Sequence, residues 1–149
     1  MSVRQADISK KPVVFRQATA TGRILLKRET IRMIKEGRLE KGDPLAISKT
    51  MAILAVKKTP EMLALCHPLN IEHVDVVETV RADSIEATVT VSAHEKTGVE
   101  MEALTAVSIA LLNIWDVVKA YEKDDGGQYP SAKIEGIRVV EKVKGNGRS

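Results

Sequence analysis

Strict two-residue alternation is the feature of this chain that most constrains its fold. Over residues 84–92 the odd positions are apolar, and the even positions are Glu, Thr or Ser. A period of two is typical of a β-strand with one buried face. Residues 71–80 form a second β-rich run, separated from the first by a turn at residues 81–83. The two runs predict an antiparallel hairpin with one solvated face.

The segment after this hairpin has helical periodicity instead. From about Glu102 to Lys123, apolar residues recur at three- and four-residue spacing, at Leu104, Val107, Leu111, Trp115 and Val118. The pattern ends at residues 124–127, which contain two aspartates and two glycines. This long helix is expected to cover the apolar face of the hairpin.

Two further strands and three shorter helices are expected around them. Residues 13–27 predict a strand with a break at Gly22, and residues 134–143 predict a last strand. Thr30 is expected to cap a short helix that stops at Gly37. The remaining two helices carry a cap followed by proline, at Asp43-Pro44 and at Thr59-Pro60.

Helices on one face of an antiparallel sheet make an α+β domain, and this element order favours a ferredoxin-like arrangement. The length of 149 residues, with 44% hydrophobic and 29% charged residues, fits a single domain over residues 1–149. The polar ends, residues 1–12 and 144–149, are expected to be flexible.

Composition also bears on compartment and partners. The chain contains no run of about eighteen uncharged apolar residues, and its N-terminus lacks the pattern of a secretion signal, so we expect a cytoplasmic protein without a membrane partner. The single cysteine, Cys66, cannot form an intramolecular disulfide. The formal charge of +3 comes from scattered basic residues, and aromatics are only 3%. This argues against nucleic acid and suits a small polyanion such as a nucleoside triphosphate.

Asp116 and Lys119 are three residues apart on the predicted long helix and therefore share one face. A carboxylate beside an ammonium is a candidate proton-transfer pair when burial and charge balance its pKa values. The alternative is a surface salt bridge worth about 0.2–0.5 kcal/mol. The sequence leaves both interpretations open.

Glu100 and Glu102 flank Met101 just after Gly98. In an extended turn the two carboxylates would share a face, whereas a helix would separate them by about 200°. The alternative is that they are first-turn acids, favoured by the positive end of the helix dipole. Both interpretations remain open from the residues alone.

Cys66 and His67 are adjacent, so their side chains are not expected to form a nucleophile pair with each other. A buried structural role for Cys66 is one alternative. The three histidines, His67, His73 and His94, raise a metal-dependent hydrolase as another, but they lack the close paired spacings of a structural zinc site, so we expect no metal site. His67 precedes Pro68, and its extended backbone suits projection into a cleft and donation to a phosphate.

Basic residues that could hold phosphates are dispersed along the chain, at Arg16, Lys41, Lys57 and Lys58. No glycine-rich phosphate loop is present, since Lys96-Thr97-Gly98 lacks the upstream glycine and the helix spacing of such a loop. Phosphates would therefore be held by side chains, and these could come from two subunits.

Several short blocks, in order, carry a family resemblance. They are Val14-Phe15-Arg16, Lys41-Gly42-Asp43, Ala55-Val56-Lys57-Lys58-Thr59, Leu65-Cys66-His67-Pro68-Leu69, the stretch from Lys96 to Ala106, and Asp116 with Lys119. From about Asp7 to Lys142 the chain resembles the molybdenum cofactor biosynthesis protein C family, the cyclic pyranopterin monophosphate synthases.

The resemblance implies a lyase of molybdenum cofactor synthesis. Its substrate would be a purine nucleoside triphosphate derivative, (8S)-3',8-cyclo-7,8-dihydroguanosine 5'-triphosphate, converted to cyclic pyranopterin monophosphate and diphosphate. It also implies ferredoxin-like subunits in a homohexamer, a trimer of dimers with sites between subunits. No cofactor is required by this reading, although Mg²⁺ could accompany the triphosphate.

The resemblance also assigns residues. Asp116, Lys119 and Lys41 match the reaction centre and are expected to transfer protons. The matching substrate-binding residues are Leu65, Cys66, His67, Met101 and Glu102, with Glu100 beside them. Arg16, Lys57 and His67 are the candidates for the triphosphate, where cations would stabilise the departing diphosphate.

The chain departs from the family pattern in three places. Asn70 replaces a more usual apolar residue, and Trp115 stands where tyrosine is frequent. The C-terminal tail follows the family's glycine-rich tail only loosely, although Lys142, Lys144 and Arg148 keep its charge. The opposing hypothesis from another class is a basic oligomeric module that binds nucleotides or RNA without turnover.

Overall fold

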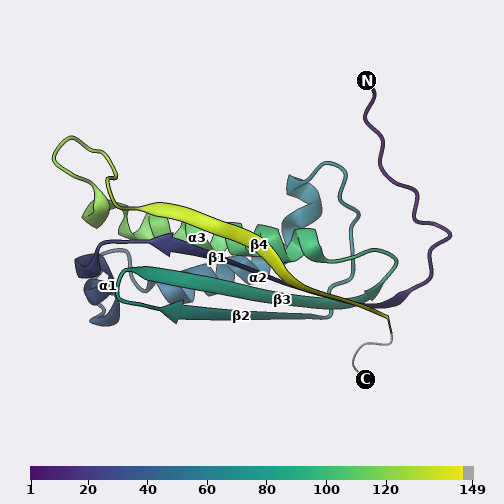
Figure 1. Ribbon diagram of the computed structural model, residues 1–149, viewed down its shortest axis with the longest axis horizontal. Helices are drawn as coiled ribbons and strands as arrows, with labels where there is room; N and C mark the ends of the chain where they lie inside the picture. The colour runs from purple at the N-terminus through teal and green to yellow at the C-terminus, as the bar shows by residue number, and fades with distance from the viewer. Residues whose placement is uncertain (146–149) are drawn as a thin grey trace.

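A computed structural model describes residues 1–145 (Figure 1). The elements follow the order β1 (Val14–Leu25), α1 (Arg28–Lys35), α2 (Pro44–Met62), β2 (His73–Val80), β3 (Ser84–Glu95), α3 (Glu100–Glu122) and β4 (Lys133–Gly145). The four strands form one antiparallel sheet in the order β2-β3-β1-β4. This is the predicted α+β, ferredoxin-like arrangement, with one extra helix in the first crossover.

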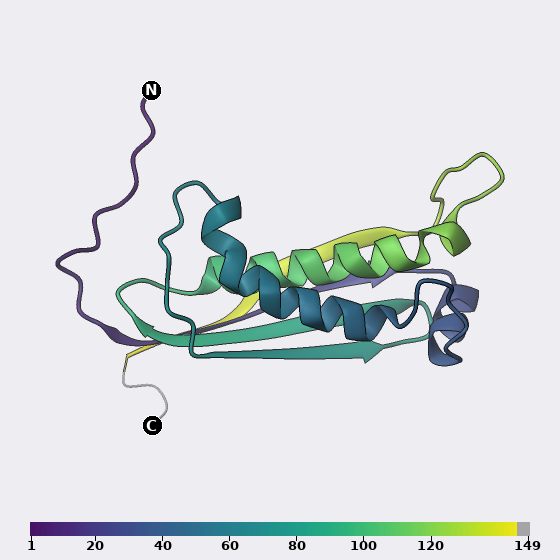
Figure 2. The same ribbon diagram turned by 180° about the vertical axis from the view of Figure 1, so that it is seen from behind.

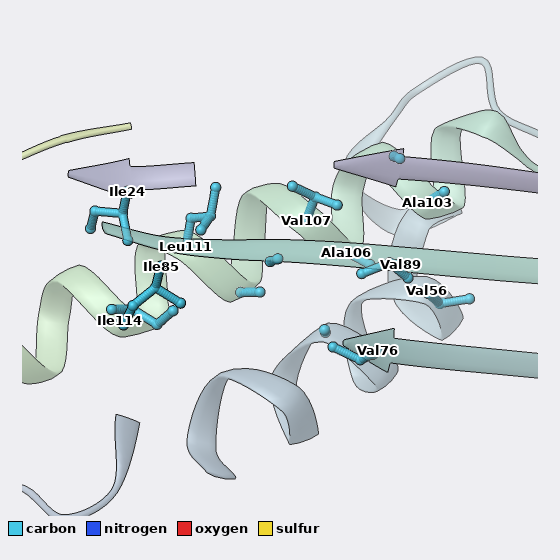
Figure 3. Close-up of a cluster of buried hydrophobic side chains, with 14 of the residues drawn as sticks. Ile24, Val56, Val76, Ile85, Val89, Ala103, Ala106, Val107, Leu111 and Ile114 are labelled. Carbon is cyan, nitrogen blue, oxygen red and sulfur yellow. The ribbon is translucent and has the colours of Figure 1, made fainter. Parts of the chain in front are cut away.

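Helices α2 and α3 lie side by side along one face of the sheet (Figure 2). Alternation in β3 directs its apolar side chains toward them, as its two-residue period predicts: Ile85, Ala87, Val89, Val91 and Ala93 are fully buried. They pack with Val107, Leu111 and Ile114 of α3 and with Val56 of α2 (Figure 3). The core therefore lies between the sheet and these two helices.

The other face of the sheet is polar and partly solvated. Threonines pair across its two central strands, since the Thr19 and Thr90 hydroxyls are 2.9 Å apart and those of Thr21 and Thr88 are 3.1 Å apart. Cross-strand hydroxyl pairs of this kind stabilise register. This is the wet face that the hairpin pattern predicts.

Gly22 does not break β1, contrary to the sequence-based expectation. The strand continues for twelve residues, and a Cβ at position 22 would lie 2.9 Å from Val107 Cγ1 and from Ile137 Cγ1, and 3.1 Å from Leu111 Cδ1. The glycine therefore allows α3 and β4 to pack closely on the strand. From the sequence alone, a glycine that permits close packing looks the same as one that forms a turn.

Two other expectations about helices were wrong. Thr59-Pro60 does not begin a separate helix, because α2 runs through Pro60 to Met62. Pro60 stands two residues before the last helical residue, Met62, so it removes one backbone bond, the one that position 60 would make to Val56, and only two helical residues follow it. Thr30 is not a cap either: α1 begins at Arg28, and the Thr30 hydroxyl is buried and donates to Glu122.

Helix α3 is long and apolar enough to cross a membrane by length and composition alone, with a mean hydropathy of 1.5 over an 18-residue window. Half of that window is buried, between α2 and the sheet. Its apolar character is accounted for by its place in the core.

The ends of the chain differ from one another. Residues 1–13 contain no helix or strand and extend away from the sheet (Figure 1). At the other end, β4 continues through Lys144 and Gly145, which the sequence assigned to a flexible tail. The rest of that predicted tail, with Arg148, lies outside the described residues.

Candidate active site

Apart from Lys57, the predicted site residues fall into two clusters at opposite ends of α3. One surrounds the first turn of the helix, together with the loop after α2 and the N-terminal segment, and the other surrounds its last turns, next to α1 (Figure 2). Glu102 and Asp116 are fourteen positions apart, which is about 21 Å along a helix. One chain therefore does not bring the two clusters together.

The last-turn cluster consists of Asp116, Lys119 and Lys41. Lys119 Nζ lies 3.1 Å from Asp116 Oδ1, and Lys41 Nζ lies 3.2 Å from Oδ2 and donates to the Asp116 backbone carbonyl at 2.9 Å. Lys119 reaches Asp116 because the two residues are three positions apart on α3, whereas Lys41 lies in the loop between α1 and α2. The carboxylate is thus held between two ammonium groups.

This cluster is open to solvent, and the Asp116 side chain is 61% exposed. Hydrogen bonds from Lys119 and then from Lys41, with the charges of both, lower the pKa of Asp116 below its ordinary value. Asp116 is therefore ionised across the neutral range. Leu112, Trp115 and Ile134 line a shallow hollow beside Asp116 and Lys119, and Trp115 packs edge-on against Tyr129.

The first-turn cluster centres on Glu102, which is buried to 1% exposure. Its Oε2 lies 3.6 Å from Cys66 Sγ, which donates to it, while Oε1 has no hydrogen-bond partner within residues 1–145. Burial raises the pKa of the Glu102 carboxyl above its ordinary value. Burial, followed by the charge of Glu102, also raises the pKa of the Cys66 thiol to about 11. Cys66 is therefore a protonated donor and not a thiolate nucleophile.

Glu100 and Glu102 both lie in the first turn of α3 and do not share a face, which decides between the two interpretations of their spacing. Glu100 turns back over Gly98, so that its carboxylate occupies the space where a Cβ at position 98 would lie, and its Oε1 lies 2.7 Å from Lys142 Nζ. Burial acts to raise the pKa of Glu100, but the hydrogen bond from Lys142, that from its own backbone and the charges of Lys142 and Arg16 outweigh it and lower the pKa.

Arg16 lies beside this first turn, on the helix-covered face of β1, and is only 3% exposed. Its guanidinium donates to the backbone carbonyls of Glu95, at 3.3 Å, and Lys96, at 3.2 Å. A guanidinium carries five N–H donors, so these two bonds leave others for an anion.

The loop after α2 adds an apolar rim. Leu65 and Cys66 border a shallow hollow with Met101, Met62 and Leu63, next to the buried Glu102. Five of the predicted substrate-binding residues therefore lie together at this end of the molecule: Leu65, Cys66, Met101, Glu102 and Glu100. His67 follows directly, and its Nε2 lies 2.8 Å from the Ala6 carbonyl of the N-terminal segment.

Lys57 stands apart from these residues. It is exposed on α2, and no ion pair or hydrogen bond of its side chain occurs within residues 1–145. Its neighbour Lys58 lies 3.4 Å from Glu61. The structure thus places Lys57 on the surface of the helix that leads to Cys66, without bringing it to the other candidates.

The three histidines do not converge. His94 Nδ1 lies 2.7 Å from Glu72, His67 contacts Ala6, and His73 is exposed on the edge strand β2. In the part of the chain that the structure describes, no three His, Cys, Asp or Glu side chains are arranged to hold a metal ion. A preformed centre for the hydrolase hypothesis is therefore missing from these residues.

Sequence reasoning missed Tyr121 and Glu122, at the end of α3. Glu122 is fully buried and accepts from the Thr30 hydroxyl and, at 3.1 Å, from the Lys27 backbone N–H. It thereby ties the start of α1 to the end of α3, although α1 has no side-chain cap bond at its N-terminus. An acid in the last turn of a helix opposes the helix dipole, and this was the available signal that Glu122 has a partner elsewhere.

Comparisons with known proteins agree with the resemblance carried by the motifs. A family model described as the MoaC family matches residues 5–145. A protein of Thermococcus kodakarensis named probable cyclic pyranopterin monophosphate synthase is 58% identical over 143 residues, covering 96% of this chain and 92% of its own.

Two further relatives also match nearly the full length of both chains. A Pyrococcus abyssi protein with the same name is 57% identical over 95% of this chain and 89% of its own. A Methanothermobacter thermautotrophicus protein, named probable cyclic pyranopterin monophosphate synthase accessory protein, is 55% identical with the same coverage. With a matching family model over residues 5–145 and relatives that are 55% to 58% identical along nearly its full length, the chain belongs to the MoaC family.

Proposed function

We propose that this protein is a cyclic pyranopterin monophosphate synthase of molybdenum cofactor biosynthesis, a lyase. It converts (8S)-3',8-cyclo-7,8-dihydroguanosine 5'-triphosphate to cyclic pyranopterin monophosphate and diphosphate. The names of its relatives support the product. The observation that carries the chemistry is the clamp of Lys41 and Lys119 on the two oxygens of Asp116.

The rearrangement needs protons to be added and removed at several atoms of the opening and closing rings. Lys41, Lys119 and Asp116 offer two ammonium donors and one carboxylate acceptor within hydrogen-bond reach of each other. We assign proton transfer to these three residues.

Release of diphosphate is assigned to the first-turn cluster. Attack of a sugar hydroxyl on the innermost phosphorus forms the cyclic phosphate bond, and the bond to diphosphate breaks as the hydroxyl proton is lost. Cations must stabilise the negative charge on the leaving group. We assign this role to Arg16 and His67, with Lys57 as a more distant candidate; Leu65, Cys66, Met101 and Glu102 would hold the ring system.

Because the two clusters lie about 21 Å apart in one chain, the proposed site needs the first turn of α3 from one subunit and the last turns from another. We propose that this occurs in a homohexamer, a trimer of dimers. No resident metal site is part of the proposal; a magnesium ion would enter with the triphosphate, whose oxygens suit it as ligands.

Turnover is tested directly with the cyclised triphosphate, following diphosphate and pterin product together. We expect product from the wild type, none from Lys119→Ala, and normal product from the control Lys123→Ala, which alters an exposed lysine at the end of the same helix. Binding of the compound by the wild type without release of diphosphate would overturn the proposal in favour of a nucleotide-binding module.

The shared site is tested by co-expressing two inactive subunits, His67→Ala and Lys119→Ala, under different tags. Random pairing makes about half of the dimers mixed, and each mixed dimer has one of its two sites intact, so about a quarter of the wild-type activity should return. Mixing His67→Ala with Arg16→Ala, both in the first-turn cluster, is the matched control and should restore nothing. Equal recovery in both mixtures would contradict a site built from opposite ends of two subunits.

A further inference from the structure

Lys41 reaches Asp116 from a loop that has little regular structure of its own. The loop joins α1 to α2 and contains two glycines with positive φ, Gly37 at 66° and Gly42 at 107°. The Lys41 side chain is 47% exposed, so packing does not hold its ammonium group in place. Its contacts with Asp116 therefore depend on how the loop backbone is anchored.

Tyr121 provides an anchor directly beside Lys41. Its hydroxyl accepts the backbone N–H of Glu40 at 3.0 Å, and the ring is half-buried. Tyr121 follows Asp116 by five residues on α3. The same rigid helix thus carries both the carboxylate that Lys41 contacts and the hydroxyl that fixes the preceding peptide.

The start of this segment is tied to the same helix. Glu122 accepts from Thr30 and from the backbone of Lys27, and Lys27 Nζ donates to the Tyr121 carbonyl at 3.4 Å. The stretch from Lys27 to Lys41 is therefore attached to the end of α3 at both of its ends. Of these attachments, the Tyr121 hydroxyl is the one next to Lys41.

We propose that Tyr121 is a positioning residue for Lys41: its hydroxyl fixes the Glu40 peptide and thereby holds the Lys41 ammonium against Asp116. The consequence for catalysis rests on the proposed function, but the positioning itself does not. The charged groups that face the Asp116 carboxylate are Lys41 from the loop and Lys119 from α3.

The test is a ¹³C NMR titration of the Asp116 carboxyl in the full chain. Lys41 lowers the pKa of Asp116, so Tyr121→Phe, which keeps the ring and loses the hydroxyl, should raise that pKa toward the ordinary value. Lys41→Met should raise it as well, and adding Tyr121→Phe to Lys41→Met should change nothing further. The control Tyr129→Phe alters the other tyrosine at this end, which packs on Trp115, and should leave the pKa unchanged.

Either of two results would overturn the proposal: an unchanged Asp116 pKa in Tyr121→Phe, or an equal rise when Tyr121→Phe is added to Lys41→Met. The second result would mean that the hydroxyl acts on Asp116 by another route. A circular dichroism spectrum and Tm for each variant establish that it is folded.

Turnover gives a second, separate readout. We expect kcat of Tyr121→Phe to fall on the order of fivefold, the effect of losing one ordinary hydrogen bond, and KM to change less. If the wild type does not turn over the cyclised triphosphate, the proposed function fails while the titration still decides the role of Tyr121.

Discussion

The two ends of α3 carry carboxylates in opposite environments. Glu102, in the first turn, is 1% exposed, and burial raises its pKa. Asp116, near the last turn, has a side chain that is 61% exposed, and the hydrogen bonds from Lys119 and Lys41 lower its pKa. As the pH rises, Glu102 therefore keeps its proton to a higher pH than an ordinary glutamate does. Asp116, on the same helix, loses its proton at a lower pH than an ordinary aspartate does.

This difference shows how position on one element decides the chemistry of the same functional group. At the first turn, the loop after α2 covers Glu102 and brings it the Cys66 thiol as a partner. At the last turns, two long cationic side chains reach Asp116 from outside the core. Separated pKa values of this kind are typical of sites that use one carboxyl as a donor and another as an anion.

The largest expected effect is at the exposed end. Asp116→Asn removes the charge between the two lysines and should lower kcat by on the order of 10²- to 10⁴-fold, the range of a lost acid–base group. The change is on the surface, so Tm should move little. Initial rates of diphosphate release measure kcat, and calorimetry measures Tm. A variant that keeps the wild-type kcat would show that Asp116 takes no part in the chemistry.

The next effect concerns the thiol at the buried end. With a pKa of about 11 in place of 9.0, Cys66 has about a hundredfold less thiolate than an ordinary cysteine at pH 8 and should react with iodoacetamide more slowly by that factor. Glu102→Gln removes the neighbouring charge and should restore part of the rate, because burial, the larger cause, remains. Alkylation of the wild type at the rate of a peptide thiol would show that partial burial and the charge of Glu102 do not raise the pKa of Cys66.

A smaller effect is expected midway between the two ends. Gly22→Ala places a methyl group 2.9 Å from Val107 Cγ1 and Ile137 Cγ1, and overpacking of this kind costs about 1–3 kcal/mol. Urea unfolding measures the loss, and Gly126→Ala, in the loop after α3, is the control. The pKa of Glu102 should stay raised and that of Asp116 should stay lowered in this variant. A change in either pKa would show that the packing of α3 at Gly22 determines it.

The smallest effect is a pH dependence of stability from Glu102. Its pKa in the folded protein lies above the ordinary value of 4.5, which holds in the unfolded chain. Between pH 4.5 and the pKa of the folded protein, the folded state therefore binds more protons than the unfolded state. The corresponding stability is present below pH 4.5 and is lost as pH rises through the folded pKa. Glu102→Gln should flatten this part of a plot of unfolding free energy against pH, whereas the same slope in both proteins would assign it to another group.

Much of the fold followed from short-range pattern. The two-residue period at residues 84–92 and the helical period of α3 were correct because each buries a continuous apolar face, and this depends on local geometry. Predictions at Gly22, Thr30 and Pro60 were wrong because a residue of each type occurs in several structural contexts. Gly22 is required by the packing of α3 on β1, and Thr30 donates to Glu122. Pro60 lies close to the end of α2 and does not begin a new helix.

The candidate site divides in the same way. The sequence by itself determined the family, through ordered motifs, and placed Asp116 and Lys119 on one helical face, because three-residue spacing requires it. Only the tertiary structure brought Lys41 to Asp116 across seventy-five residues, buried Glu102 beside Cys66, and set the two clusters at opposite ends of α3. These contacts join segments distant in the chain, and their formation depends on how the helices pack on the sheet, which no local pattern encodes.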